Sequence, residues 1–165
     1  MLLEDFNAAD SDKALAVLQP CLDIERWCRE ILAARPFASV DALLECAKNA
    51  AEPFTSSEVD AAMAHHPRIG EKPTGTGTEA SLARAEQSGV DPSDTDVLAA
   101  LAAGNAEYEK KFNQVFLIRA AGRSPQEILD VLAARMKNTA GEETVIVAQQ
   151  LREIALLRLE GAMST

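Results

Sequence analysis

The chain has 165 residues, of which 47% are hydrophobic and only 4% aromatic, and its formal net charge is -10 at pH 7. A chain of this length buries roughly two thirds of the surface that it exposes when unfolded, so it can enclose a water-poor pocket. The negative charge repels nucleic acids and anionic membrane surfaces at long range, so neither is expected as a partner.

Features of the N-terminus and of the cysteines favour a cytoplasmic protein. The first ten residues, MLLEDFNAAD, are acidic where a signal peptide needs a basic start and an apolar stretch. No apolar run approaches the roughly 20 residues of a membrane span. Cys21 and Cys28 are seven residues apart and would share a helix face, which favours small core residues over a disulfide or a metal site. A reducing cytoplasm, with no membrane contact, is the expected location.

Helix signals recur through the first third of the chain. Ser11 is the candidate cap of a helix that ends against Pro20. The next helical pattern, which begins at Cys21, stops before Pro36. Ser39 is the candidate cap of a third helix, which Pro53 interrupts. These three helices are predicted to be scaffold.

A short helix and a loop follow. Thr55 and Glu58 have the spacing of a capping box, which predicts a helix over about 56–65 that ends before Pro67. The segment 67–78, PRIGEKPTGTGT, contains two prolines and three glycines. It is predicted to be a loop, because such a composition does not form a regular element.

Two helices are predicted in the middle of the chain. Residues 79–89 have a helical pattern closed by a glycine, and residues 91–122 are predicted as one long helix, bent near Gly104. No alternating pattern is convincing enough for a sheet. VFLIRA, at 115–120, is nevertheless a candidate for locally extended backbone.

Two further helices complete the predicted elements. Ser124, Pro125 and Glu127 combine a capping box with proline at the first helical position. The final helix covers about 142–160. The sequence therefore predicts an all-α, single-domain bundle of seven to eight helices over residues 1–165.

The two histidines of the chain are adjacent, and helical phase separates them. Val59, Ala62 and Met63 form an apolar stripe, and His66 continues it at the i+7 position. His65 would point about 100° away from that stripe. The pattern predicts that His66 faces the interior and that His65 does not.

Two more ionisable residues fall where core residues are expected. Glu86 lies one turn after Leu82, and Arg158 ends an apolar stripe formed by Val147, Leu151 and Ile154. A buried unpaired charge costs several kcal/mol, so each needs a partner. One interpretation is a structural network in which Glu86 pairs with Arg158 and His66 caps a helix. The other is a pocket in which an imidazole, a carboxylate and a guanidinium converge on an anion, and periodicity does not choose between them.

Other motifs carry weaker signals. The run GTGT at 75–78, with Lys72 upstream, resembles a phosphate loop but does not satisfy the required pattern and follows no strand. Neither H-E-x-x-H nor a metal-type cysteine pair is present, so no metal site is expected. Tyr108, Phe112 and Phe116 are spaced by four and are predicted to pack inward.

Four blocks of the sequence resemble one enzyme family. HHPRIGEK, SLARAEQSGV, NAEYEKKFNQVFLIRAAGRS and REIALLRLE occur in the order and approximate spacing found in the decarboxylases of 2-oxo-4-hydroxy-4-carboxy-5-ureidoimidazoline (OHCU). The resemblance extends from the segment ALLECA to the end of the chain. It implies the last of three steps from urate to (S)-allantoin, an anionic ureidoimidazoline as substrate, no metal and no organic cofactor. It also implies an all-helical fold and a homodimer.

The resemblance also implies roles for individual residues. His66 and Glu86 match the catalytic residues of the family, and Arg158 matches its substrate-binding arginine. Further residues expected to line the site, partly through backbone groups, are Pro67, Ala83, Arg84, Ala85, Gln87, Phe116, Leu117, Ile118, Arg119 and Ala120. Whether Arg68 and Lys72 contact the substrate stays open.

The sequence departs from the family pattern at two places. Asn113 stands where the family usually has glycine after KF, and asparagine tolerates the left-handed backbone that glycine permits. The chain ends AMST and lacks the SKL peroxisomal address of some eukaryotic relatives, which favours a bacterial-type cytosolic enzyme.

Two other function classes compete with the decarboxylase. One is a binding module, in which an acidic helical bundle holds a purine-derived ligand or a partner helix without turnover. The other is a hydrolase of allantoin or a related ureide, which normally requires a metal site.

Overall fold

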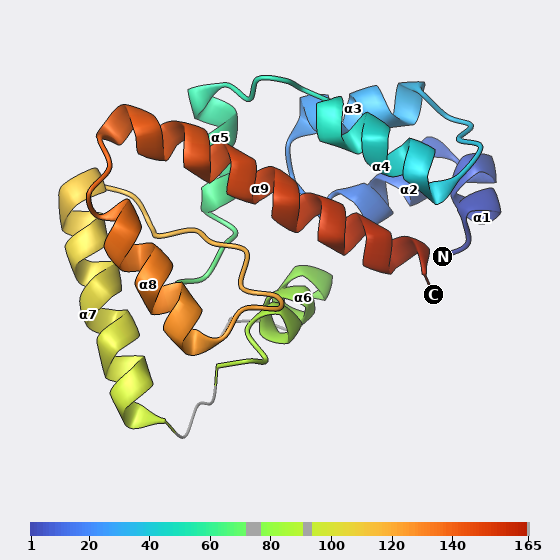
Figure 1. The fold of residues 1–165 in the computed structure, drawn as a ribbon. Coiled ribbons are helices and arrows are strands. Elements are labelled where there is room, and N and C mark those ends of the chain that lie inside the picture. The colour runs from blue at the N-terminus through green and yellow to red at the C-terminus, as the bar shows by residue number, and fades with distance from the viewer. Residues whose placement is uncertain (72–76, 91–93, 165) are drawn as a thin grey trace. The chain divides into compact units, whose positions relative to one another are not determined.

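The computed structural model describes residues 1–71, 77–90 and 94–164 (Figure 1). Within these ranges every regular element is a helix, which confirms the all-α prediction. The chain divides into two compact units. The first unit is Met1–Ala64 with Leu151–Thr165, and the second unit is His65–Gln150.

The described residues form nine helices rather than seven or eight. The first unit contains α1 (Leu3–Ala8), α2 (Ser11–Leu18), α3 (Glu25–Ala33), α4 (Val40–Asn49) and α5 (Ser56–Met63). The second unit contains α6 (Thr78–Glu86), α7 (Thr95–Phe112) and α8 (Pro125–Arg135). The last helix, α9 (Ala140–Met163), contributes residues to both units. The helix missing from the prediction is α1, which has six residues and no side-chain cap.

Side-chain caps explain where several helices begin. Ser39 caps α4, Thr55 and Glu58 form the predicted capping box at α5, and Ser124 caps α8 ahead of Pro125. The predicted cap of α2 was wrong by one residue, because the side chain of Asp10 accepts the hydrogen bond from the Lys13 N–H. Either residue type caps well, so sequence alone does not distinguish the two positions.

The first unit has its own apolar core. Trp27 on α3 is fully buried, and its Nε1–H donates to the Ala47 carbonyl of α4 at 2.8 Å. Cys21 and Cys28 are buried, as predicted for core residues. Burial raises the pKa of the Cys28 thiol to about 12. This thiol is therefore protonated and unreactive at neutral pH.

The core of the second unit is built mainly where α7 packs against α8. Its buried residues are Ile69, Val90, Leu101, Tyr108, Phe116, Ile118, Ala120, Ile128 and Leu132. Gly104 permits this packing, because a Cβ atom there would lie 2.3 Å from Cδ2 of Leu132. The helix α7 continues through Gly104. The glycine is thus explained by close packing of two helices.

The prediction that the long helix reaches residue 122 was wrong. α7 ends at Phe112, and Asn113 adopts the left-handed conformation, with φ 54° and ψ 35°. The Asn113 N–H donates to the Glu109 carbonyl at 2.8 Å and closes the helix. Asn113 therefore ends the helix in the left-handed conformation that the family glycine would permit. Residues 115–120, which follow it, are non-helical.

Candidate active site

Both histidines follow helix α5 and do not belong to it. α5 ends at Met63, so the helical-phase argument for His66 was wrong, although Val59 and Ala62 are buried as the stripe predicted. His66 is nevertheless partly buried and His65 is exposed, as expected. The helix ends before His66 because Pro67 disfavours the helical backbone conformation for the residue that precedes it.

His65 has a different environment from His66. Its side chain is 49% exposed, and its Nδ1 lies 3.9 Å from a carboxylate oxygen of Glu79, near the start of α6. An exposed pair at this distance contributes little to stability. His65 is therefore a surface residue of the second unit.

The loop that carries His66 is bonded to neighbouring segments through backbone groups of Ile69 and Gly70. The Gly70 N–H donates to Oε1 of Gln87 at 3.0 Å, and Nδ2 of Asn105 donates to the Ile69 carbonyl at 3.0 Å. Gly70 has a φ of +90°, a conformation that favours glycine. The loop is thus bonded both to the residue after α6 and to α7.

The predicted segment at the end of α6 is only partly buried. Glu86 is the last residue of α6 and Gln87 follows as its C-terminal cap, and both side chains are partly buried. Ala83 is buried, whereas Arg84 and Ala85 are exposed. His66, Pro67, Glu86 and Gln87 therefore all lie in the second unit, and the bond from Gly70 to Gln87 links their two segments.

The predicted segment 116–120 is buried and non-helical. Four of its five residues are at most 7% exposed, and Arg119 is partly buried. The Leu117 carbonyl accepts a hydrogen bond from Nη1 of Arg135 at 2.5 Å, and the Arg119 N–H donates to Oε1 of Gln150 at 2.8 Å. Side chains from α8 and α9 therefore fix the backbone of this segment.

Arg158 ends the buried stripe of α9, as predicted. Val147, Leu151, Ile154 and Arg158 are each at most 5% exposed. Nη1 of Arg158 donates to the Pro20 carbonyl at 2.9 Å. Arg158 belongs to the first unit, whereas His66 and Glu86 belong to the second, so their convergence on one ligand stays a prediction.

A buried polar cluster in the second unit was missed by the sequence analysis. Glu143 is fully buried, and its carboxylate accepts hydrogen bonds from Tyr108, Arg135 and Asn138. Burial alone would raise the pKa of Glu143, but these hydrogen bonds outweigh it and lower that pKa. Burial and the bond to Glu143 together raise the pKa of Tyr108 to about 12.

A sequence signal for this cluster existed. Glu143 precedes Val147 by four residues, so it continues the α9 stripe by one further step toward the N-terminus. Arg135 likewise follows Ile128 by seven residues and Leu132 by three on α8. Extending both stripes to charged positions would have predicted the buried pair.

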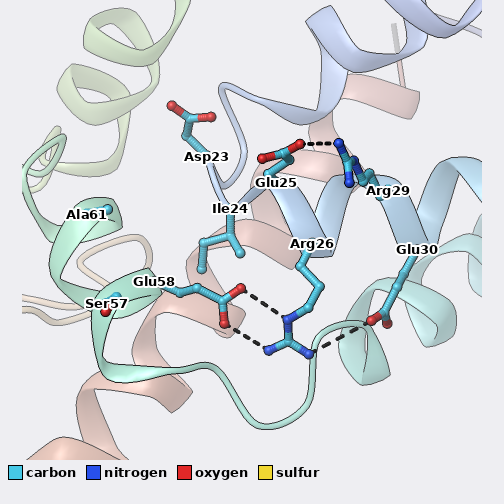
Figure 2. Close-up of a pocket in the computed structure, with 9 residues that line it drawn as sticks. All are labelled: Asp23, Ile24, Glu25, Arg26, Arg29, Glu30, Ser57, Glu58 and Ala61. Atoms are coloured by element: carbon cyan, nitrogen blue, oxygen red, sulfur yellow. Dashed lines mark hydrogen bonds and ion pairs between the residues drawn. The ribbon is translucent and has the colours of Figure 1, made fainter.

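The first unit contains a cavity of about 490 Å³ that includes none of the predicted site residues. Figure 2 shows its lining residues, Asp23, Ile24, Glu25, Arg26, Arg29, Glu30, Ser57, Glu58 and Ala61. Nε and Nη2 of Arg26 donate to the Glu58 carboxylate at 3.1 and 2.8 Å, and Arg29 pairs with Glu25 at 2.5 Å. The two guanidinium groups of this cavity are therefore engaged by carboxylates of the chain itself.

A smaller cavity of about 210 Å³ lies in the second unit. It is lined by Arg68, Ile69, Gly70, Glu71, Leu98, Ala102, Asn105, Ala106 and Glu109. Arg68 binds both oxygens of Glu109, at 2.5 and 3.1 Å. Its guanidinium is thus held by α7. Lys72 and residues 75–76 of the run at 75–78 lie outside the described residues.

The described residues contain neither a candidate membrane span nor a candidate metal site. None of their helices is long and apolar enough to cross a membrane. In the same part of the chain, no group of three or more His, Cys, Asp or Glu side chains is arranged to hold a metal ion.

Comparison with solved structures shows the same fold. One structure, described as OHCU decarboxylase in the presence of (S)-allantoin, is 23% identical to this chain and has a TM-score of 0.70. The match covers 95% of this chain and 100% of that one. A structure described as (S)-allantoin synthase is 15% identical and has a TM-score of 0.71. This chain, matched over its whole length, spans 55% of that second protein.

Comparison with protein families identifies the relationship. No curated protein matches the chain. The family model for OHCU decarboxylase, in contrast, matches residues 7–160. That family carries a decarboxylase activity in the allantoin-forming step of urate degradation. Because the match covers nearly all of the sequence, the chain belongs to the OHCU decarboxylase family.

Proposed function

We propose that the protein decarboxylates OHCU without a metal or an organic cofactor and forms (S)-allantoin, with His66 as the acid–base group. The observation that carries the proposal is the family match over residues 7–160, a range that includes every proposed site residue. The relative crystallised in the presence of (S)-allantoin supports the choice of product.

The chemistry of the substrate explains why no cofactor is needed. OHCU carries its carboxylate on a ring carbon that also bears a hydroxyl group, beside a C=N-type ring carbon that bears the ureido group. When the bond to the carboxylate breaks as carbon dioxide leaves, its electron pair enters this conjugated system. The substrate is its own electron sink, so the protein has to hold it, exclude water and control the protons.

Arg158 and Glu86 would hold the substrate. Arg158 is 4% exposed, so its charge acts in surroundings of low dielectric constant. We assign it the anionic or ureido portion of the substrate, since a guanidinium forks around planar acceptors. The carboxylate of Glu86 would accept hydrogen bonds from the ureido or ring N–H groups and orient the ring.

His66 would move the proton. An imidazole exchanges protons near neutral pH, and a positioned acid–base group contributes about 10²–10⁴-fold in rate. His66 would take the hydroxyl proton and deliver a proton to one face of the carbanion-like intermediate. Delivery from one side yields a single enantiomer. The partial burial of His66 and the hydrogen bonds from Gly70 to Gln87 and from Asn105 to Ile69, which hold its loop, support this role.

The remaining predicted residues would line the site. Pro67, Gln87 and the non-helical segment 116–120 supply its walls, in part through backbone groups. The exposed side chains of Arg84 and Ala85 favour a backbone role for them as well. We also propose that the chain acts as one domain, as a homodimer and in the cytoplasm.

The test uses the unstable substrate as it forms. Urate oxidase and the hydrolase that follows it generate OHCU from urate, and optical rotation is recorded after this protein is added. We expect faster loss of OHCU and accumulation of one enantiomer, unchanged when a chelator is present. An unchanged slow decay to racemic product would contradict the proposal and favour a binding module. Loss of activity with chelator would contradict metal-free catalysis.

A further inference from the structure

The buried polar cluster joins three parts of the second unit. One oxygen of Glu143, on α9, accepts hydrogen bonds from the Tyr108 hydroxyl of α7 at 2.5 Å and from Nε and Nη2 of Arg135 on α8 at 2.9 and 2.7 Å. The other oxygen accepts from Nδ2 of Asn138 at 2.9 Å. Four donors therefore fix this carboxylate, and the carboxylate holds two nitrogen atoms of the Arg135 guanidinium, Nε and Nη2.

The remaining groups of Arg135 face the segment 116–120. Its Nη1 donates to the Leu117 carbonyl, and its guanidinium lies over the Phe116 ring, 4.6 Å from the ring centroid. The ring of Tyr108 lies 5.7 Å away. Arg135 is 5% exposed, so these contacts occur away from solvent, where charge-assisted hydrogen bonds are strong. The position of the Leu117 carbonyl therefore depends on the orientation that Glu143 gives to Arg135.

A second contact fixes the same segment two residues later. Oε1 of Gln150 accepts the Arg119 N–H at 2.8 Å, and Gln150 follows Glu143 by seven residues, on the same face of α9. The Arg119 carbonyl accepts a hydrogen bond from Nε of Arg123 at 2.9 Å. Residues 117–119 are non-helical, so side-chain contacts such as these supply the restraint that a helix would supply.

Stability alone does not explain a buried ion pair at this place. Replacing such a pair with apolar side chains of similar volume is often neutral or stabilising, because two charges no longer have to be desolvated. An apolar side chain cannot, however, donate a hydrogen bond to a carbonyl oxygen. The feature that only the charged pair provides is a fixed backbone at Leu117.

We propose that Arg135, oriented by Glu143, is a positioning residue of the decarboxylation, which fixes the backbone of the segment 116–120 that lines the substrate site. The inference rests on the proposed function, because that function makes this segment a wall of the site. Neither side chain needs to touch the substrate. Misplacement of a site wall by about 1 Å costs on the order of 100-fold in rate.

The test separates positioning from stability with three variants. Arg135→Lys keeps the charge but loses the planar fork, and Glu143→Gln leaves the guanidinium without its carboxylate. The double variant R135M/E143M removes both charges and is designed to keep a folded protein. Leu43→Ala is the matched control, because it truncates a fully buried residue in the core of the first unit. The melting temperature and the separate values of kcat and KM are measured for each protein below its melting temperature.

We expect kcat/KM to fall about 10- to 100-fold in all three variants, even where the melting temperature equals that of the wild type. Leu43→Ala should lower the melting temperature with kcat/KM unchanged below it. Hydrogen exchange at the Arg119 amide should be faster in R135M/E143M than in the wild type. If the double variant folds with wild-type kcat/KM, the inference is overturned; if it does not fold, Arg135→Lys decides by the same criterion. Absence of turnover in the wild type would instead overturn the proposed function.

Discussion

The backbone N–H of Gly70 donates a 3.0 Å hydrogen bond to Oε1 of Gln87, so the loop that carries His66 is bonded to the residue that follows Glu86. Gly70 lies in a turn four residues after His66 and has a φ of +90°. A residue with a Cβ atom is strained in this conformation, whereas glycine adopts it without that cost in free energy. The geometry of the His66 loop therefore depends on a residue without a Cβ atom.

Replacement of Gly70 tests this dependence. We expect Gly70→Ala to lower the free energy of unfolding by about 1–2 kcal/mol, because alanine is strained at positive φ. A Cβ atom there would lie 3.4 Å from Leu101, an ordinary contact, so strain is the main cost. Gly161→Ala is the control, since Gly161 is helical in α9 and its Cβ would meet nothing within 4 Å. Denaturant unfolding checks both, and an equal effect of the two changes would contradict the account.

The packing of α7 on α8 predicts a coupling between Gly104 and Leu132. Gly104→Ala places a Cβ atom 2.3 Å from Cδ2 of the buried Leu132, which should destabilise by about 1–3 kcal/mol. Leu132→Ala removes that atom and should itself cost about 2–5 kcal/mol. The double variant should cost less than the sum, because the cavity left by Leu132 accepts the new methyl group. Additivity within about 0.5 kcal/mol in urea unfolding would refute this coupling.

The ion pair of Glu58 and Arg26 predicts part of the acid sensitivity of the first unit. The hydrogen bond from Arg26 is the main cause that lowers the pKa of Glu58 from 4.5 to about 2. Because the folded-state pKa lies below the unfolded-state value, this stabilisation is present above pH 4.5 and is lost as the pH falls toward about 2. Glu58→Gln should therefore flatten the decline of the melting temperature with falling pH in that range.

The matched control for this pH series is Glu25→Gln. Glu25 pairs with Arg29, and both side chains are 75% exposed, so solvent screens the interaction. Its curve of melting temperature against pH should run parallel to that of the wild type. If the Glu58→Gln curve is also parallel, the ion pair does not contribute to acid stability.

Local signals predicted the beginnings of helices well. Thr55, Ser39 and Ser124 cap the helices that follow them, because a short side-chain acceptor reaches the backbone N–H groups within its own turn. Such contacts lie within three residues and are visible in the sequence. The stripe that ends at Arg158 was also predictable, since helical periodicity determines which face is buried.

Contacts between distant residues explain what local patterns missed. The predicted long helix ran through residues 116–120, which contain no residue that breaks a helix, although 115–120 was also a candidate for extended backbone. In the structure α7 ends at Phe112, and Arg135 on α8 and Gln150 on α9 bind the backbone of residues 116–120. Helix propensity is a weak guide to the end of a helix where tertiary contacts of this kind exist. The early end of α5 is a smaller case, because Pro67 limits the helix without specifying which preceding residue is the last.

The central claim is that His66 transfers the proton that forms (S)-allantoin, and its most direct test is optical rotation during OHCU turnover by the wild type, His66→Asn and His65→Asn. Asparagine keeps a polar side chain but exchanges no proton near neutral pH, so His66→Asn should lose at least about 100-fold in kcat while remaining folded. His65→Asn should keep most of the wild-type rate and enantiomeric excess, because His65 is an exposed residue beside Glu79. Equal losses in both variants, or a His66→Asn enzyme that still forms one enantiomer at the wild-type rate, would contradict the claim.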